Sequence, residues 1–295
     1  MFENLREKAI EWGLTDDERT RINHALKNLN SAGYDPWGVS PDALATSLIP
    51  ALWFYKNYFR VETEGLENIP PGRVMLVANH GGQVPIDGTL IATAVLTQGN
   101  PPRVVRGMVE RWAPSLPFVS TFFARTGQLT GDIRNARDIL EHEEALMVFP
   151  EGVSGSGKSI FERYKLQKFG NGFMRLALDM HCPIVPVSVV GTEESLPSLT
   201  ALKPLAKKLG IPYLPLIPTG IIPLPTKVFI RFGTPIYPKC ETQDPSATEL
   251  EPLVAEVKRS IKTAINETLR RRGEKIFTGG NAAKRTRIDT GRGQE

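Results

Sequence analysis

Five short apolar runs rich in valine constrain the fold of this 295-residue chain more than any other feature. They are Arg73–His80, Pro102–Val109, Ala145–Glu151, Pro183–Gly191 and Lys227–Gly233. Stretches with helical spacing separate them, among them 87–98, 133–143 and 172–180. Continuous apolar strands that alternate with helices are typical of a parallel sheet covered on both faces. The sequence therefore predicts an α/β fold with a mainly parallel central sheet flanked by helices.

The chain divides into three regions by composition. Residues 1–60 indicate charged helices, with Thr15 and the acids after it as a helix start signal, and then an aromatic segment. Residues 61–270 hold the apolar runs and a closing amphipathic helix, and we expect them to form the main domain. Residues 271–295 are basic and rich in Gly, Asn and Thr, which predicts a disordered tail. Such a tail is either simply solvated or attracted to nucleic acid or an anionic lipid surface.

The segment from Pro41 to Gly65 allows two interpretations. It carries a cluster of aromatic side chains: Trp53, Phe54, Tyr55, Tyr58 and Phe59. Aromatic rings of this kind favour the headgroup boundary of a membrane, but the same residues would also suit a helix packed on the domain. No stretch approaches the roughly 20 apolar residues of a spanning helix, and the N-terminus lacks the apolar core of a signal peptide. We expect a helical docking region that places the protein peripherally on the cytoplasmic face of a membrane.

The cysteines and the net charge exclude several classes of protein. Two cysteines, Cys182 and Cys240, give no disulfide framework and indicate a reducing compartment, and no Cys/His cluster suggests a metal. The net charge is +4 and lies entirely in the tail, so the rest of the chain is close to neutral. We therefore expect no metal, no cofactor and no nucleic-acid partner.

His80 lies at the end of the first apolar run, in a Gly-rich turn that leads into a helical stretch. Open α/β sheets place their chemistry beyond the carboxyl ends of the strands. Asp87, at the expected start of the next helix, can accept a hydrogen bond from one imidazole nitrogen and leave the other basic. The pattern fits a general base with its orienting carboxylate, and it also fits an acid that only satisfies the helix N-terminus.

A second strand end supports the catalytic interpretation, because the motif Phe-Pro-Glu-Gly at 149–152 follows a buried run. With it, the chain resembles the glycerolipid acyltransferase family of the bacterial 1-acyl-sn-glycerol-3-phosphate (lysophosphatidic acid) type. The resemblance covers about residues 60–240 and consists of four blocks in order. They are Asn79, His80 and Asp87; Gly127 to Arg134; Phe149 to Gly152; and Val185, Pro186 and Val187.

The resemblance implies an O-acyltransferase in phospholipid biosynthesis. His80 and Asp87 would deprotonate a glycerolipid hydroxyl, which attacks the thioester of acyl-CoA or acyl carrier protein. The expected acceptor is 1-acylglycerol 3-phosphate and the product phosphatidate. Glu151 and Gly152 would shape the acceptor site, and the other expected substrate-binding residues are Asn79, Arg125 and Arg134. Backbone N–H groups near Gly81 and Gly82 would stabilise the oxyanion.

The chain departs from the family pattern in three places. Six residues separate His80 from Asp87, whereas the family has four. Arg134 stands one position later than expected, which makes Arg125 a competing cation for a phosphate. Val153 and Ser154 replace the Arg that follows the third block, so that Lys158 or a nearby cation would have to substitute for it. A neutral lipid or another alcohol is therefore an alternative acceptor.

Two rival classes and one further feature stay open at the level of sequence. Residues Gly152 to Ser159 match the phosphate-binding loop G-x-x-x-x-G-K-[ST], which would make the chain a nucleotide-binding protein. Against this, Gly170 and Gly172 interrupt the helix that should follow, and no later strand ends in the Asp that holds Mg²⁺. A catalytically silent lipid-surface protein would require loss of the His/Asp pair. The proline-broken stretch Ile211 to Pro225 is either a buried connection or a flap over an acyl chain.

Overall fold

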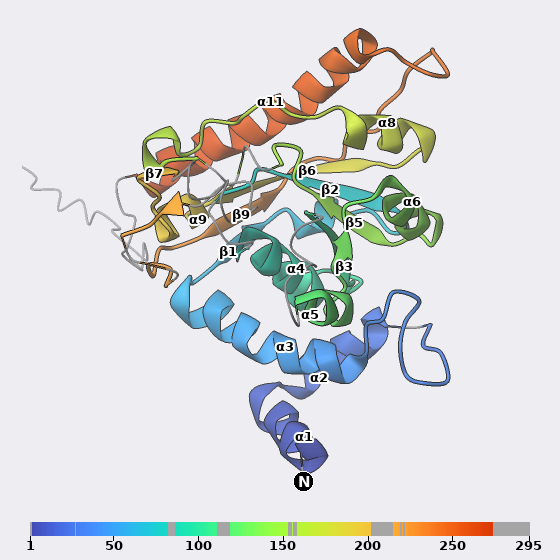
Figure 1. Ribbon diagram of the computed structural model, residues 1–295, viewed down its shortest axis with the longest axis vertical. Coiled ribbons are helices and arrows are strands. Elements are labelled where there is room, and N and C mark those ends of the chain that lie inside the picture. The colour runs from blue at the N-terminus through green and yellow to red at the C-terminus, as the bar shows by residue number, and fades with distance from the viewer. Residues whose placement is uncertain are drawn as a thin grey trace, which may run out of the picture.

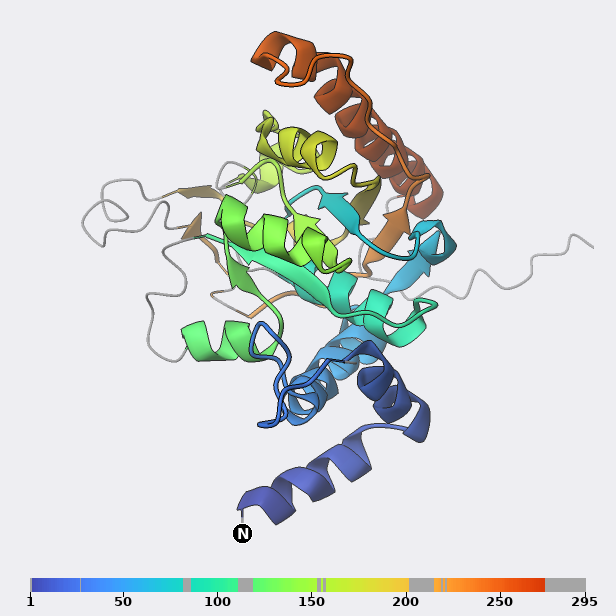
Figure 2. The same cartoon turned by 90° about the vertical axis from the view of Figure 1, so that its right-hand side faces the viewer.

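The protein is described by a computed structural model that covers residues 2–26, 28–81, 86–110, 119–152, 155, 158–201, 215–218, 220 and 222–273. Its centre is a seven-stranded sheet in the order β1-β9-β6-β2-β5-β3-β4 (Figures 1 and 2). The strands are β1 (Glu62–Glu64), β2 (Val74–Ala78), β3 (Val105–Val109), β4 (Leu129–Thr130), β5 (Ala145–Val148), β6 (Ile184–Val190) and β9 (Phe229–Phe232). Only β6 and β9 pair antiparallel; the other neighbours are parallel, as predicted.

The central strands are apolar throughout because helices cover both faces of the sheet. Every residue of β2 is buried. Met75 and Val77 belong to the cluster on one face, whereas Val74 and Leu76 belong to the cluster on the other, as the two-residue period of a strand requires.

One face of the sheet packs against helices α6 (Ile133–Glu141), α8 (Gly172–Asp179) and α11 (Ala247–Arg272). In Figure 1, α11 runs along the top of the molecule in orange and red. Its start is fixed by Ser246, whose hydroxyl accepts from the backbone of Glu249 while the Glu249 carboxylate accepts from the backbone of Ser246. Val257, Ile261 and Ile265 recur at helical spacing on its buried face.

The other face packs against α4 (Ile86–Gln98), and an N-terminal layer covers α4 in turn. The layer consists of α1 (Phe2–Gly13), α2 (Asp16–Ala25) and α3 (Pro41–Trp53). Thr15 and Glu18 cap the start of α2 reciprocally, so the predicted start signal at Thr15 is correct. In Figure 2 these blue helices lie on the opposite side of the sheet from α11.

The aromatic segment is packed on the domain in part, and contact of its exposed rings with a membrane stays a prediction. It continues α3 into a π-helical turn, Phe54–Tyr58. Tyr55 and Phe59 are buried against the sheet, whereas Trp53 and Phe54 are 52% and 38% exposed. Among the residues that the structure describes, no helix has the length and apolar character to cross a bilayer.

The remaining elements are short. They are two 3-10 turns (Leu66–Asn68 and Ile160–Glu162), α5 (Val119–Arg125), α9 (Thr192–Ser195) and the strand pair β7 (Thr200–Ala201) and β8 (Pro215–Leu216). Most of the predicted basic tail, residues 274–295, lies outside the described residues.

Candidate active site

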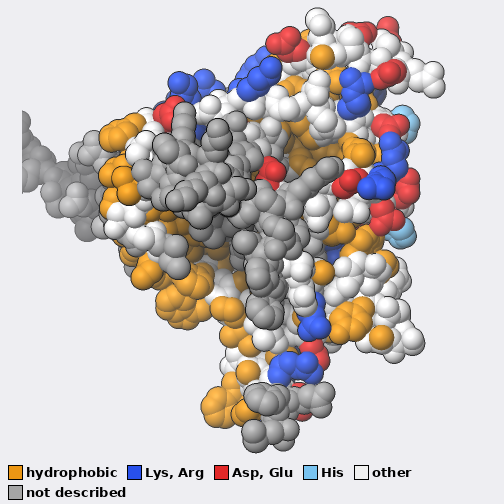
Figure 3. Space-filling model, viewed as in Figure 1, with side chains coloured by type: hydrophobic (Ala, Val, Ile, Leu, Met, Phe, Trp, Pro, Cys, Tyr) orange, Lys and Arg blue, Asp and Glu red, His pale blue; other side chains and the backbone are white. Residues whose placement is uncertain are grey.

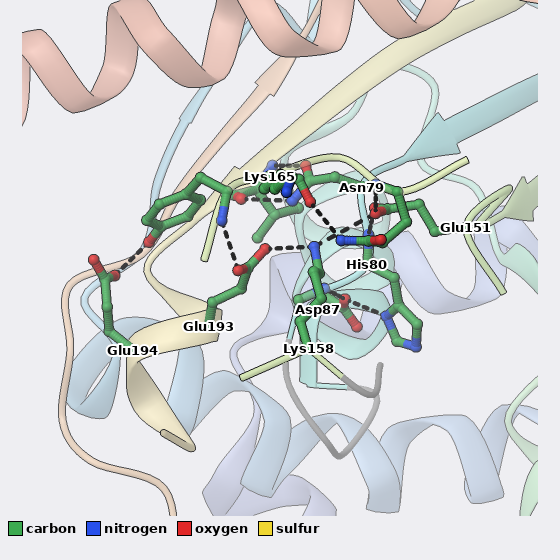
Figure 4. A network of polar contacts seen from close by, with 12 residues as sticks. Asn79, His80, Asp87, Glu151, Lys158, Lys165, Glu193 and Glu194 are labelled. Atoms are coloured by element: carbon green, nitrogen blue, oxygen red, sulfur yellow. Dashed lines mark hydrogen bonds and ion pairs between the residues drawn. The ribbon is translucent and has the colours of Figure 1, made fainter. Parts of the chain in front are cut away.

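Three adjacent strands deliver the polar residues of the site. β2 lies between β5 and β6 and is parallel to both, so the carboxyl ends of all three strands meet at one edge of the sheet. His80 follows β2, Glu151 follows β5, and Glu193 lies in α9 directly after β6. Figure 4 shows these side chains converging.

His80 and Asp87 are in contact. Nδ1 of His80 lies 2.7 Å from Oδ2 of Asp87, which also accepts from the backbone N–H of Gly81 at 2.9 Å. Asp87 is fully buried in the first turn of α4, and its other oxygen accepts from the backbone N–H of Gly88 at 2.8 Å. Because an ionised carboxylate only accepts, the proton lies on Nδ1 and leaves Nε2 as the basic nitrogen. The six-residue spacing therefore still brings the predicted pair together.

The surroundings of His80 set its pKa. Burial is the largest influence and acts to lower it, but the charge and hydrogen bond of Asp87, with the charge of Glu151, outweigh burial and leave the pKa above its usual value. Lys158 opposes this increase. The ring also stacks on Phe149, with centroids 4.6 Å apart. The imidazole is thus held in one orientation with a basicity suited to a general base.

Two glycines allow the chain to close around this pair. A Cβ on Gly81 would lie 2.6 Å from Cγ of Glu193, and a Cβ on Gly155 would lie 2.8 Å from Cβ of Glu151 and 3.0 Å from Cβ of His80. Real Cβ atoms do not approach that closely. Part of the Gly-rich character of both turns is therefore a packing requirement.

Glu151 joins the end of β5 to the end of β2. Its Oε1 accepts from the backbone N–H of His80 at 3.1 Å, and its Oε2 accepts from the backbone N–H of Gln167 at 2.6 Å. The side chain has no exposed surface. These contacts give Glu151 a structural role; a contact with an acceptor stays a prediction. Gly152 has a φ of +52° and donates to the carbonyl of Phe149, which closes the turn after the strand.

The Asn79 side chain joins β2 to β6. Its amide donates to the carbonyl of Val189 at 3.0 Å and accepts from the N–H of Val189 at 2.8 Å. The side chain is completely buried. Both contacts position the chain just before His80, and binding of substrate by Asn79 stays a prediction.

Comparison with known proteins decides the family. The acyltransferase family profile matches residues 60–190. An uncharacterized protein from Mycobacterium leprae is 38% identical over 249 residues, which are 80% of this chain and 67% of that protein. The chain belongs to the acyltransferase family.

Two further similarities concern more distant proteins. A mouse protein named "DGAT1/2-independent enzyme synthesizing storage lipids" is 27% identical over 188 residues, covering 62% of this chain and 55% of that protein. The crystal structure of the 1-acyl-sn-glycerophosphate acyltransferase PlsC from Thermotoga maritima superposes with a TM-score of 0.53 at 21% identity, covering 77% of this chain and 81% of that one. The latter likeness concerns the fold.

The two arginines that the sequence suggested for substrate binding are both exposed. Arg134 is 88% exposed and pairs with Asp132 at the start of α6, with Nε 3.1 Å from Oδ1. It follows β4, three strands and roughly 14 Å from β2, and is therefore not close to His80. Arg125 lies at the end of α5. Phosphate binding by either arginine stays a prediction.

The position of Lys158 argues against the interpretation of Gly152 to Ser159 as a phosphate-binding loop. Its side chain is 4% exposed, and Nζ lies 3.0 Å from Oε1 of Glu193 and 3.5 Å from Oε2 of Glu151. The segment after Ser159 forms a 3-10 turn rather than a long helix. A lysine held between two buried carboxylates is poorly placed to hold nucleotide phosphates. The same burial argues against Lys158 as a cation for an acceptor phosphate.

Sequence reasoning missed the polar network beyond Glu151. Glu193 also accepts from the backbone N–H of Tyr164 at 2.7 Å, and the Tyr164 hydroxyl donates to Glu194. Burial and the nearby carboxylates hold the pKa of Tyr164 well above its usual range, so this hydroxyl keeps its proton. Arg272, from the end of α11, pairs with both oxygens of Glu194 at 2.7 and 2.9 Å. The sequence feature that could have indicated this network is the pair of acids Glu193 and Glu194 shortly after the buried strand β6.

The structure describes one of the two glycines whose backbone N–H groups were predicted to stabilise the oxyanion. The N–H of Gly81 donates to Asp87, so in this arrangement it already has an acceptor within the protein. Gly82 lies outside the described residues. Within the described ranges, no three His, Cys, Asp or Glu side chains gather in a way that could hold a metal ion.

Proposed function

We propose that this acyltransferase transfers a fatty acyl group from acyl-CoA or acyl carrier protein to a glycerolipid hydroxyl, with His80 as the general base. The observation that carries the proposal is the contact between the buried Asp87 carboxylate and Nδ1 of His80 at 2.7 Å. This pairing leaves Nε2 facing away from Asp87, where it can take a proton. The family membership supports acyl transfer as the reaction.

His80 alone accounts for both proton transfers of the proposed reaction. Nε2 of His80 takes the proton of the acceptor hydroxyl as its oxygen forms a bond to the thioester carbonyl carbon. The tetrahedral intermediate then collapses, the C–S bond breaks, and the imidazolium gives its proton to the departing thiolate. The products are an ester and a free thiol. Asp87 stabilises the imidazolium between the two proton transfers.

The acceptor that we propose first is 1-acylglycerol 3-phosphate, which would give phosphatidate in phospholipid biosynthesis. A neutral glycerolipid is the second candidate, and two observations favour it. Arg134 and Arg125 are both exposed, and the storage-lipid enzyme from mouse is a relative at 27% identity. The predicted acyl-chain flap, Ile211 to Pro225, falls partly outside the described residues and stays a prediction.

The acceptor is tested by product analysis. Purified protein is incubated with acyl-CoA, or with acyl carrier protein carrying the same chain, and either lysophosphatidic acid or monoacylglycerol. The lipids are then separated and identified by mass spectrometry. Phosphatidate as the main product supports the first acceptor, and diacylglycerol supports the second. Absence of a new ester with every pair would contradict the proposed function.

We also propose that the protein works on a membrane surface, which it contacts with the exposed end of α3. Figure 3 shows hydrophobic side chains gathered over this end at the left of the view. Trp53 and Phe54 are exposed there, and the Tyr58 hydroxyl donates to the carbonyl of Pro223, which brings the 70% exposed Ile222 close by. Aromatic side chains next to aliphatic ones suit the headgroup boundary. The expected side is the cytoplasmic face.

A further inference from the structure

Lys158 occupies a central place at the edge of the sheet where the strands deliver the site. It comes from the Gly-rich segment after β5, and its Nζ lies between Oε1 of Glu193 and Oε2 of Glu151, at 3.0 and 3.5 Å (Figure 4). All three side chains are at most 5% exposed. The proposed acyl transfer assigns no role to this lysine.

The two carboxylates belong to the strands on either side of β2. Glu151 follows β5 and Glu193 follows β6, so Lys158 bridges the space beyond the end of β2, where His80 stands. Through the other oxygen of Glu151, the bridge reaches the backbone N–H of His80. On the far side, Glu193 accepts from the backbone of Tyr164. A continuous path of polar contacts therefore runs from α9 to the backbone of the base.

The ammonium group also acts on the charge of Glu193. Burial is the largest influence on the pKa of Glu193 and raises it, and the charge of Glu151 adds to the increase. The charge and hydrogen bond of Lys158 lower this pKa but leave it above its usual value. Without the ammonium, two buried carboxylates would lie close together with no cation between them, and their repulsion would weaken the hold of Glu151 on the backbone N–H groups of His80 and Gln167.

We propose that Lys158 is a positioning residue for the catalytic base: by bridging Glu151 and Glu193 across the end of β2, it holds the two carboxylates together and fixes the backbone of His80. The proposal rests on the proposed function, because it gives Lys158 a task in that reaction. The Lys of the apparent phosphate loop thus acts inside the protein and holds no nucleotide.

Within the part of the chain that the structure describes, the charged and titratable groups connected to the bridge come from several elements. They are His80 after β2, Asp87 of α4, Glu151 after β5, Tyr164 after the second 3-10 turn, Glu193 and Glu194 of α9, and Arg272 of α11.

The first test is Lys158→Met. We expect kcat to fall about 10- to 100-fold with little change in KM, because the base is displaced while the substrate surfaces are kept. In this variant Glu193 loses the cation that lowers its pKa, so it keeps its proton to higher pH than a glutamate of the unfolded chain does. Stability must therefore fall as pH rises through the raised pKa of Glu193, so that the loss of melting temperature is larger at about pH 8.5 than at about pH 5.5. Lys262→Met, on the exposed face of α11, is the matched control and should match wild type.

The second variant, Lys158→Met/Glu193→Gln, separates positioning from charge balance. It removes one carboxylate with the ammonium, so the pH dependence of stability should return to that of wild type, and the variant should fold even where Lys158→Met does not. Since the bridge to Glu151 is still absent, we expect kcat to stay about 10-fold or more below wild type. Recovery of the wild-type kcat would overturn the proposal and reduce Lys158 to charge compensation.

Failure of this proposal can be told from failure of the proposed function. If wild type transfers no acyl group, the function is wrong, and the melting temperatures of the two variants still test the bridge. If wild type is active and Lys158→Met keeps its kcat, the function stands and the positioning role is wrong.

Discussion

Asp87 makes three contacts that together explain a carboxylate at the start of α4. It accepts from Nδ1 of His80 and from the backbone N–H groups of Gly81 and Gly88. The contact with the Gly88 N–H, inside α4, is the kind that a helix-start acid alone would make, whereas the contact with Gly81 ties the turn after β2 to the start of α4. The contact with the imidazole is the additional one, and it separates the catalytic interpretation from the capping one.

Asp87→Asn should lower kcat by about 100-fold or more, because an amide can donate to Nδ1 and stabilise the wrong tautomer. The pH profile should change as well. His80 must lose its proton to act, so kcat/KM of wild type falls on the acid side, with a midpoint above the usual histidine pKa. Loss of the Asp87 charge should move that midpoint to lower pH.

The matched control is Asp42→Asn, which removes a carboxylate from the first turn of α3. We expect wild-type kinetics there. Wild-type kcat and an unmoved midpoint in Asp87→Asn would show that Asp87 serves only the helix.

At the scale of single residues, the sequence predicted the pair but not its support. His80 and Asp87 could be predicted because a strand end, a Gly-rich turn and a helix start are local sequence signals. Glu193 is more than 100 residues away from His80 in the sequence, and its proximity depends on β6 lying next to β2. Strand order depends on tertiary packing, so the sequence around Glu193 does not predict that this residue lies near His80.

At the scale of elements, the valine-rich runs became strands because burial on both faces demands continuous apolar sequence. β1 and β4 were not predicted. They are three and two residues long and lie at the two edges of the sheet. The residues of β1 are polar, and those of β4 are only partly buried. The antiparallel direction of β9 was not predicted either, since an apolar run carries no information on strand direction.

The end of α11 is fixed to the site by one buried ion pair. Arg272 and Glu194 are each 6% exposed in their side chains. Arg272→Met would leave the Glu194 carboxylate buried without its cation, so we expect a loss of about 3–5 kcal/mol in the free energy of unfolding. Guanidinium chloride unfolding measures this loss.

Arg271 is the matched control, because it pairs with Glu64 at a site where both side chains are about half exposed. Solvent screens such a pair, so Arg271→Met should cost less than about 1 kcal/mol. Equal losses in the two variants would contradict the structural importance of the buried pair.

At the scale of the whole molecule, the helices are distributed unequally between the two faces of the sheet. A single layer formed by α6, α8 and α11 covers one face, whereas the N-terminal layer lies beyond α4 on the other. The exposed aromatic end of α3 therefore lies on the opposite side of the sheet from α11. Composition indicated an aromatic segment, but which rings are exposed depends on the packing of α3 and its π-helical turn.

Trp53→Ser/Phe54→Ser should weaken binding to phosphatidylglycerol-containing vesicles by about 10-fold or more, because two exposed aromatic rings no longer enter the interface. Vesicle co-sedimentation measures the partition. The control is Tyr237→Ser, which removes a 64% exposed aromatic residue from a pocket between α11 and the segment after β9. This variant should bind the vesicles as wild type does. Equal binding by all three proteins would contradict docking through α3.

The central claim is that His80 is the base of an acyl transfer, and thiol release tests it most directly. Wild type and His80→Ala are compared with acyl-CoA in detergent, with and without lysophosphatidic acid or monoacylglycerol. We predict that thiol appears at an appreciable rate only with an acceptor and that His80→Ala is slower by at least about 100-fold. Thiol release by His80→Ala at the wild-type rate would contradict the account.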